Sequence, residues 1–248
     1  MARPRGYVLY EGPSLLDSAP IVVVAVTKSR NVKTANTIQT FILRADVDPL
    51  VANKSGADYS ICGICPLRGT PTDDPARATA AGRRCYVVLV QAPLSVWSAY
   101  RRGADPMASD IAAVGAGRRI RLGTYGDPAA VPAAVWRALV SRAESWTGYS
   151  HQAMAGVIGA EYRPELTMRS VESLKDAQQA WVEGDRTFRV VQSVAEVSPA
   201  EVLCPASREG GYRTTCASCG LCAGSTVRAK SVAIVAHGAG ASHFATVG

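Results

Sequence analysis

Residues 120–145 read IRLGTYGDPAAVPAAVWRALVSRAES, and this stretch decides the fold class. Its first part, residues 120–125, has the apolar, β-branched and aromatic composition of a strand. A Gly-Asp-Pro turn follows at residues 126–128, and a helix is expected near residues 131–145. A strand that leads directly into a helix is the repeating unit of a parallel α/β sheet.

The same alternation continues on both sides of this stretch. Helices are predicted at residues 93–103, opened by Pro and closed by Gly, and at residues 171–183, which Gly184 ends. Further strands are predicted at 86–90, 146–151, 166–170, 187–191, 202–204 and 232–237. Seven short strands favour a full or partial (βα) barrel-like parallel sheet, a TIM barrel-like fold, over a Rossmann fold, because no GxGxxG loop follows a strand.

The N-terminal part has a different pattern. Residues 7–10, 21–26 and 37–44 are rich in Val, Ile, Thr and Tyr and are separated by turn-like segments, which predicts an antiparallel sheet or hairpin. We therefore divide the chain into an N-terminal β segment, 1–60, packed on a barrel-like main domain, 61–248. The main domain carries two clusters of cysteines and a predicted flexible loop at 69–84.

Composition limits the class of protein. Hydrophobic residues make up 48% and charged residues 19% of the 248 residues, which argues for a folded globular protein. No apolar run reaches the roughly 20 residues that a membrane span needs, and the start lacks the apolar core of a signal peptide, so we expect the cytoplasm. The net charge of +7 favours a nucleotide or nucleic acid as partner, although a merely solvated basic surface explains it equally well.

The seven cysteines fall into two groups. Cys62, Cys65 and Cys85 have the spacing C-x2-C-x19-C. The second group, C-x11-C-x2-C-x2-C, consists of Cys204, Cys216, Cys219 and Cys222. An odd number of clustered cysteines in a chain without a signal peptide points to metal rather than to disulfides.

The two groups differ in the number of ligands that they offer. The group of four closes a 4Fe–4S cluster or a structural zinc site, and its C-x2-C-x2-C run is ferredoxin-like. The group of three leaves one iron of a second 4Fe–4S cluster open for chemistry, unless His151 or His237 completes a Cys3His zinc site. Zinc at both groups, with no catalysis, is the alternative.

Other side chains lie at predicted strand ends, where barrel enzymes place their active sites. Asp127, beside Gly126, is a candidate general base or ligand for a ribose or base, and alternatively a helix cap. His151 and His237 are candidate catalytic residues, with a buried structural role as the alternative.

Two arginines and Gly126 are candidates for binding a cofactor. Arg169 and Arg189 lie in the predicted strands 166–170 and 187–191 and are expected to flank the same mouth, where they would bind a carboxylate or phosphate. An ordinary salt bridge is the alternative for each arginine.

Several segments resemble an uncharacterised cysteine-rich family carried by bacteriophages and plasmids, which implies the host cell cytoplasm but no activity. They are SICGICPLRG, RRCYV, QAPLSVW, RLGTYGDPAAVPAAVWRALV, WTGYSHQ, LCPAS, TTCASCGLCAG and VAIVAHG. A weaker resemblance is to radical S-adenosylmethionine enzymes, which are barrels whose three-cysteine cluster binds that cofactor. Their C-x3-C-x2-C motif is absent, and the C-x2-C-x19-C spacing is more similar to the carbon–phosphorus lyase radical enzyme.

The leading hypothesis is a phage or mobile-element iron–sulfur enzyme that acts on a nucleotide or nucleic acid, with an electron donor as a further partner. A zinc-stapled nucleic-acid-binding or host-interaction protein without catalysis is the second hypothesis. The third is a zinc-dependent base-modifying enzyme that uses Asp127. The sequence leaves the oligomeric state open.

Overall fold

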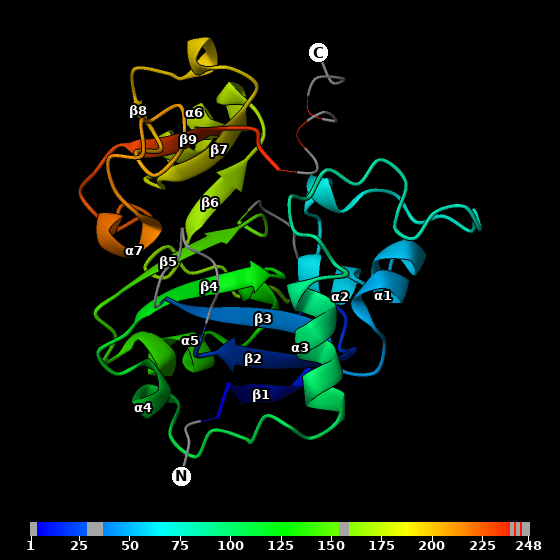
Figure 1. Ribbon diagram of the computed structural model, residues 1–248. Coiled ribbons are helices and arrows are strands. Elements are labelled where there is room, and N and C mark those ends of the chain that lie inside the picture. The colour runs from blue at the N-terminus through cyan, green and yellow to red at the C-terminus, as the bar shows by residue number, and fades with distance from the viewer. Residues whose placement is uncertain (1–3, 29–36, 154–158, 239–240, 242–243, 245–248) are drawn as a thin grey trace.

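A mostly parallel sheet organises the computed structural model, which describes residues 4–28, 37–153, 159–238, 241 and 244 (Figure 1). Within these residues the sheet has nine strands in the order β1-β2-β3-β4-β5-β6-β7-β9-β8. Strands β1 (Gly6–Pro13), β2 (Pro20–Val26) and β3 (Ile38–Arg44) are antiparallel neighbours, as predicted. The parallel strands are β4 Arg119–Tyr125, β5 Ser145–Ser150, β6 Met168–Val171, β7 Thr187–Val191, β8 Glu201–Leu203 and β9 Ser231–Val235.

Short helices connect and cover the strands. The α-helices are α1 Pro49–Ser55, α2 Tyr59–Cys62, α3 Ala92–Arg101, α4 Ile111–Gly115, α5 Ala133–Val140, α6 Leu174–Val182 and α7 Cys216–Cys219. Three 3-10 turns are η1 Pro66–Arg68, η2 Pro128–Ala130 and η3 Val194–Glu196. The predicted helices correspond to α3, α5 and α6, whereas α1, α2, α4 and α7 were not predicted.

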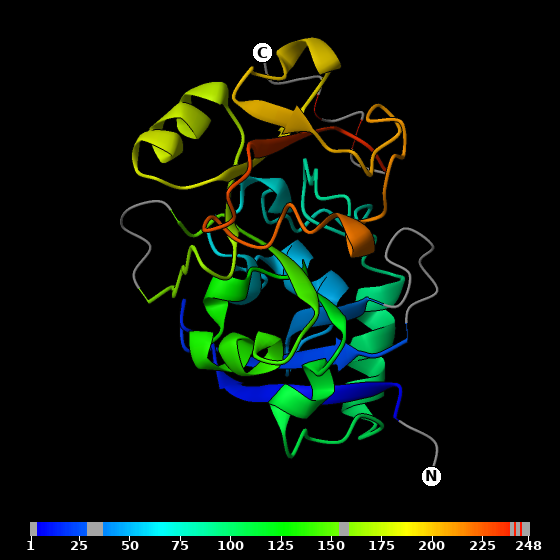
Figure 2. The same cartoon turned by 90° about the vertical axis from the view of Figure 1, so that its left-hand side faces the viewer.

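The main hydrophobic core lies around β2 and β3. All residues from Ile21 to Ala25 and from Ile38 to Leu43 are buried, because helices cover both faces of the sheet there. Helix α3 packs on one face and α5 on the other (Figures 1 and 2). Trp136 of α5 is buried in this core, and its indole nitrogen donates to the carbonyl of Pro128 at 2.8 Å.

Strand β5 divides the sheet into two halves. Its residues Ser145–Gly148 pair with β4, but only Tyr149 and Ser150 pair with β6. We call β1–β5 with α1–α5 the N-terminal half, and β6–β9 with α6 and α7 the C-terminal half. Helix α7 lies between the two halves in both views (Figures 1 and 2).

The predicted full barrel is not confirmed, because the described sheet is not closed. Strands β1 and β8 are its two edges and do not pair with each other. The antiparallel strands β1 and β2 extend one edge beyond the parallel region, so closure would have to join two strands from distant parts of the molecule. The sheet also runs without interruption from β3 into β4, across the predicted boundary at residue 60.

The predicted strand at residues 86–90 is wrong. This segment is a loop, in which Tyr86, Val88 and Val90 are exposed. The guanidinium of Arg83 donates to the carbonyls of Cys85 and Val87, at 2.9 and 2.7 Å. These carbonyls therefore have a side-chain partner in place of a neighbouring strand.

Candidate metal centres

The first cysteine group, Cys62, Cys65 and Cys85, is assembled by short turns at the edge of the N-terminal half. Cys62 ends α2, and the amide of Cys65 donates to the Cys62 carbonyl at 3.1 Å. The amide of Cys85 donates to the carbonyl of Leu67 at 2.9 Å, which brings the distant third cysteine back to the same turn. Burial raises the pKa of the Cys62 thiol well above its usual value, and the nearby groups Asp58, Cys65 and Cys85 raise it further.

His151 joins this group from the end of β5. Burial lowers the pKa of the imidazole, but interactions with Cys65 and Glu172 outweigh burial and raise the pKa well above its usual value. Nε2 lies 2.8 Å from Oε1 of Glu172, which follows β6. The imidazole thus interacts with both the Glu172 carboxylate and the Cys65 thiol. The arrangement therefore has three thiols, one imidazole and a carboxylate behind the imidazole.

Asp127 fixes the loop that carries His151. Its buried carboxylate accepts hydrogen bonds from the Ser150 hydroxyl at 2.7 Å and from the His151 amide at 2.8 Å. It also accepts from the Gln152 side chain at 3.1 Å and from the Ala129 amide at 3.0 Å. With four donors already on its two oxygens, the carboxylate acts as the cap of η2 and as the anchor of β5.

Gln152 holds the first cysteine turn against β5. Its Nε2 donates to the Cys62 carbonyl at 2.9 Å, and its Oε1 accepts from the Ile64 amide at 3.2 Å. Gly63 lies between them with a φ of 54°, and a Cβ there would be 2.1 Å from the Gln152 oxygen. Only glycine therefore allows the amide clamp to reach both sides of this turn.

The second cysteine group comes from the end of β8, from α7 and from the turn after α7, and consists of Cys204, Cys216, Cys219 and Cys222. Cys204 follows β8, and its amide donates to the Ala233 carbonyl of β9 at 2.8 Å. Helix α7 carries Cys216 and Cys219 and is capped by Thr215, whose side chain accepts from the Ser218 amide. The three remaining cysteines are all electrostatic neighbours of Cys222.

Cys222 is the most buried thiol of the second group. Burial raises its pKa to about 12, although a hydrogen bond with the Tyr149 side chain lowers it. The Cys222 carbonyl also accepts from the Gly148 amide of β5 at 3.1 Å. Cys222 is therefore held by the same strand whose end carries His151.

Arg186 organises the loop after Cys222. Its buried guanidinium donates to the carbonyls of Leu221, Gly224, Ala229 and Lys230, at distances between 2.6 and 3.0 Å. Backbone carbonyls of an irregular loop need such donors when no strand or helix supplies them. A single arginine thus fixes both ends of residues 221–230.

The side chains of the two cysteine groups do not have the geometry of a metal site in this structure. In the described residues, no group of three or more His, Cys, Asp or Glu side chains is placed to hold a metal ion, and the seven cysteines are free. One buried hydroxyl without a hydrogen-bond partner in the described chain is nevertheless suited to donate to a metal-bound thiolate. The Tyr125 hydroxyl is buried, has no hydrogen-bond partner in the described chain, and has Cys62 and Cys85 among its electrostatic neighbours. A thiolate sulfur is an acceptor for this kind of donor.

The other predicted site residues have partners away from the two groups. Arg169 pairs with Glu183 and Asp185, at 2.7 and 2.6 Å, and Arg189 pairs with Glu201 at 2.6 Å. The two arginines therefore form the ordinary salt bridges that were the alternative to ligand binding.

The two remaining predicted site residues, His237 and Gly126, contact other parts of the chain. His237 is exposed and stacks on Tyr86, with ring centroids 6.3 Å apart, so it lies beside the residue after Cys85. Gly126 has a φ of 86°, and a Cβ there would lie 2.6 Å from Cβ of Ile42. Gly126 therefore allows the turn after β4 to pass close to Ile42 of β3.

Sequence reasoning missed Glu172, Gln152 and Arg121. Gln152 is the neighbour of His151, so its position was a signal that we did not use. Glu172 follows β6 and meets His151 only because β5 and β6 are parallel neighbours. Arg121 lies between the apolar residues Ile120 and Leu122 of β4, and a charged side chain at such a position is a sequence signal for a specific role.

Comparisons with protein-family models, with curated proteins and with solved structures gave no match. Any function must therefore be inferred from the residues themselves. None of the helices in the described parts of the chain is long and apolar enough to cross a membrane.

Proposed function

We propose that the chain is a zinc-stapled protein that binds nucleic acid, with one zinc ion at each cysteine group. The observation that carries this proposal is the approach of His151, with Glu172 behind it, to Cys65 of the first group. It supplies the fourth ligand that the three cysteines lack. A site closed by four protein ligands is typical of structural zinc.

The carboxylate behind the imidazole supports zinc in particular. A histidine that binds zinc commonly donates its second nitrogen to a carboxylate, which orients the ring and raises its basicity. Glu172 occupies that position at 2.8 Å from Nε2. Zinc binding would have to draw the three thiols and the imidazole together, since no group of three such side chains in the described residues is already placed to hold an ion.

The second group offers four thiols and no vacancy. Its ligands come from the end of β8, from α7 and from the turn after α7, so one ion would join three segments that few apolar contacts hold together. Removing Cys222 from this group would break the contact to Tyr149 of β5 as well. A structural ion at this position explains why the thiols gather there.

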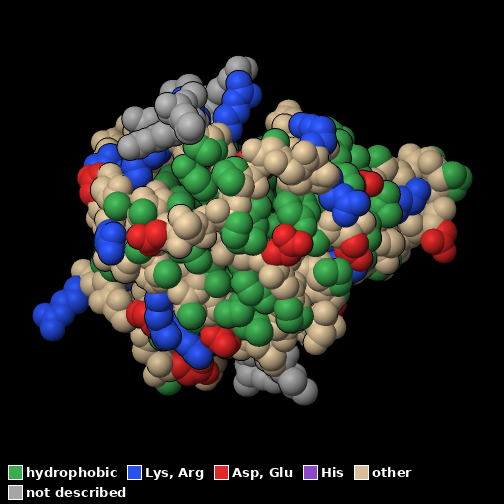
Figure 3. Space-filling model, turned by 90° about the horizontal axis from the view of Figure 1, so that it is seen from below, with side chains coloured by type: hydrophobic (Ala, Val, Ile, Leu, Met, Phe, Trp, Pro, Cys, Tyr) green, Lys and Arg blue, Asp and Glu red, His purple; other side chains and the backbone are tan. Residues whose placement is uncertain are grey.

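The surface around the second group supports a polyanionic partner. Arg208, Arg213, Arg228 and Lys230 are exposed in the loops between and after these cysteines, next to the exposed aromatic ring of Tyr212. Cationic side chains bind phosphates, and an exposed aromatic ring stacks on bases. By contrast, the face seen from below, where β1 lies, carries both basic and acidic side chains, with hydrophobic side chains between them (Figure 3).

Metal analysis with a nucleic-acid binding series tests the proposal. The full chain, purified without chelator, is expected to contain two zinc ions and to bind single-stranded DNA or RNA with an affinity that falls steeply with salt. An Arg208→Ala/Arg213→Ala variant should bind more weakly with its zinc content intact. A variant at Arg137 and Arg142, which are exposed in the N-terminal half, is the matched control. Colourless protein without zinc would overturn the proposal.

The predicted iron–sulfur enzyme is the second candidate. Two observations favour it: the C-x2-C-x2-C run itself, and the position of Asp127, His151 and Glu172 within two residues of the carboxyl ends of the parallel strands β4, β5 and β6. In that case His151 moves aside and the first group holds a 4Fe–4S cluster with one open iron. Anaerobic purification separates the two candidates. A brown protein that absorbs near 400 nm would show that the cysteine groups hold iron–sulfur clusters in place of zinc. Cleavage of S-adenosylmethionine after reduction would then test the radical chemistry.

A further inference from the structure

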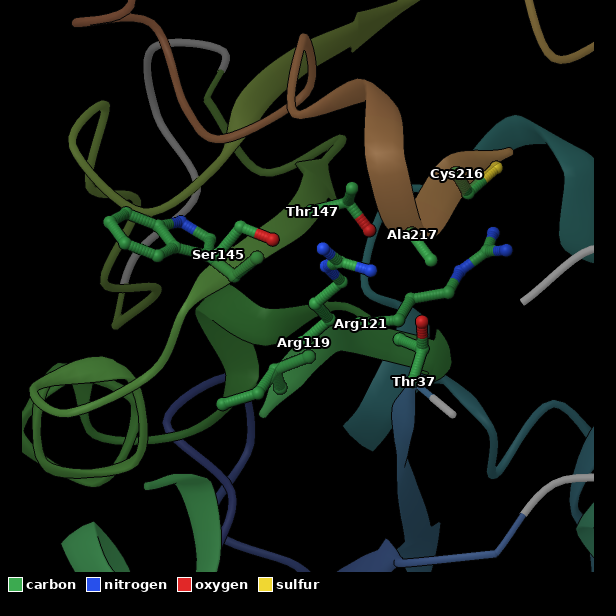
Figure 4. Close-up of a pocket in the computed structure, with 9 residues that line it drawn as sticks. Thr37, Arg119, Arg121, Ser145, Thr147, Cys216 and Ala217 are labelled. Atoms are coloured by element: carbon green, nitrogen blue, oxygen red, sulfur yellow. The ribbon is translucent and has the colours of Figure 1, made fainter. Parts of the chain in front are cut away.

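Two side chains connect the cysteine groups. Tyr86 directly follows Cys85 of the first group, and Arg121 projects from β4 toward Cys216 of the second (Figure 4). Nη2 of Arg121 donates to the Tyr86 hydroxyl, and the guanidinium carbon lies 5.8 Å from the centroid of the Tyr86 ring. The pair therefore spans the space between the groups.

Arg121 is placed to compensate negative charge at the second group. It interacts electrostatically with Cys216 and Cys222, and it lines a hollow of about 10 Å³ together with Cys216. Its Nε is buried and has no hydrogen-bond partner within the described residues. A thiol loses its proton when it binds a metal, so each loaded centre gains negative charge close to this guanidinium.

Arg119 of the same strand is a useful comparison with Arg121. It is two residues before Arg121 and lines the same hollow. Its guanidinium, however, forms an ion pair with Glu144, whose side chain is 53% exposed. Arg121 instead takes a neutral hydroxyl as its partner, which leaves its charge available to thiolates.

We propose that the Tyr86–Arg121 pair couples the two centres, so that metal at the first group raises the metal affinity of the second. Metal at the first group fixes Cys85 and with it Tyr86, whose hydroxyl holds the guanidinium of Arg121 beside Cys216 and Cys222. Without that metal, the loop at residues 83–90 has Arg83 as its main support and holds Arg121 less firmly. This inference rests on the proposed function, since it requires that both groups bind metal.

Thiol alkylation at a series of buffered zinc concentrations measures each group separately. The peptide with Cys216, Cys219 and Cys222 reports on the second group, and the peptide with Cys62 and Cys65 reports on the first. In a Cys62→Ser/Cys65→Ser variant, half-protection of the second group is expected to need at least about fivefold more zinc than in the unmodified chain. By reciprocity, Cys216→Ser/Cys219→Ser should weaken the first group by the same factor.

The milder variants Arg121→Met and Tyr86→Phe test the connection without removing a ligand. Arg121→Met should weaken the second group about tenfold, and the added Cys62→Ser/Cys65→Ser change should then have no further effect on it. Tyr86→Phe should also abolish the coupling. Arg119→Met, the matched control, should retain the full coupling.

Two outcomes separate the inference from the proposed function. If zinc protects both groups in the unmodified chain, but loss of the first group shifts the second by less than twofold, the coupling is wrong and the metal sites stand. The same conclusion follows if coupling persists in Arg121→Met. If zinc protects neither group in the unmodified chain, the proposed function itself fails.

Discussion

The two halves of the sheet are built from different interactions. In the N-terminal half, the main core joins residues of β1–β4 with Val131, Trp136 and Leu139 around α5. In the C-terminal half, the cluster of buried hydrophobic residues that the structure describes consists of Met168, Cys222 and Val232. One of these three is a cysteine of the second group.

Buried polar contacts supplement the small apolar core of the C-terminal half. Arg186 holds a loop through four carbonyls, and Arg189 forms a buried ion pair with Glu201. A domain with a small core generally needs an additional staple, such as a structural metal. The difference suggests that metal matters mainly to the C-terminal half, and the predictions below test this contrast.

Removal of metal should have the largest effect. Structural zinc contributes an apparent ~10 kcal/mol or more to folding of small metal-dependent units. Adding chelator is therefore expected to abolish amide-exchange protection in β7 and β9, while β2 and β3 remain protected. Hydrogen exchange with mass spectrometry measures this, and chelator saturated with zinc is the control. Equal loss in both halves would contradict the contrast.

Breaking the Arg189–Glu201 pair should come next. The Glu201 side chain is 0% exposed and Arg189 is 5% exposed, so Arg189→Met leaves a carboxylate buried without its partner. The free energy of unfolding should fall by about 3–5 kcal/mol in urea titrations of the metal-loaded chain.

A matched exposed pair serves as the control for Arg189→Met. Arg137 pairs with Glu165 at 2.8 Å, but their side chains are 56% and 41% exposed. Arg137→Met should therefore change the free energy of unfolding by less than about 1 kcal/mol. If the two variants cost the same, burial of polar groups is not what stabilises the C-terminal half.

A cavity in the N-terminal half should destabilise the protein independently of metal. Leu122 of β4 is fully buried, and Leu122→Ala removes apolar contacts in the main core. We expect a loss of about 2–5 kcal/mol. The loss in protection of β2 and β3 should be the same with and without chelator, as measured by hydrogen exchange. A loss that appears only in chelator would show that the two halves are not distinct.

The sequence predicted the elements whose patterns are local. The run Ile21–Ala25 and the Gly-Asp-Pro turn after Tyr125 show their structure within a few residues, and β2 and β4 lie where they were expected. Residues 86–90 had the same apolar composition, but Arg83 donates to the carbonyls of Cys85 and Val87, and a composition pattern does not reveal this competition. Likewise, the four-residue helix α7 is too short to have a periodicity.

The residues of the candidate site likewise divide into those with a local sequence signal and those without one. Spacing identified the seven cysteines as two groups, and His151 was one of two histidines considered for the vacant position. The choice between His151 and His237 depends on the packing of β5 against the first cysteine turn, through Asp127 and Gln152. Glu172 and Arg121 act through residues far away in the sequence, so no local pattern marks them.

The smallest expected effect concerns the carboxylate behind His151. Glu172→Gln keeps the shape of the side chain but removes its charge, so the imidazole loses the partner that orients it and raises its basicity. Loss of such a partner typically lowers metal affinity about 10–100-fold. Alkylation of the Cys62–Cys65 peptide in buffered zinc measures the change.

With the first group saturated, the second should keep its affinity, because Glu172 contacts none of its thiols. Glu183→Gln is the control, since Glu183 pairs with Arg169 at 2.7 Å and is remote from His151 in its contacts. If Glu172→Gln leaves the first group unchanged, the imidazole is not a ligand, and the three cysteines regain the open position that iron–sulfur chemistry requires.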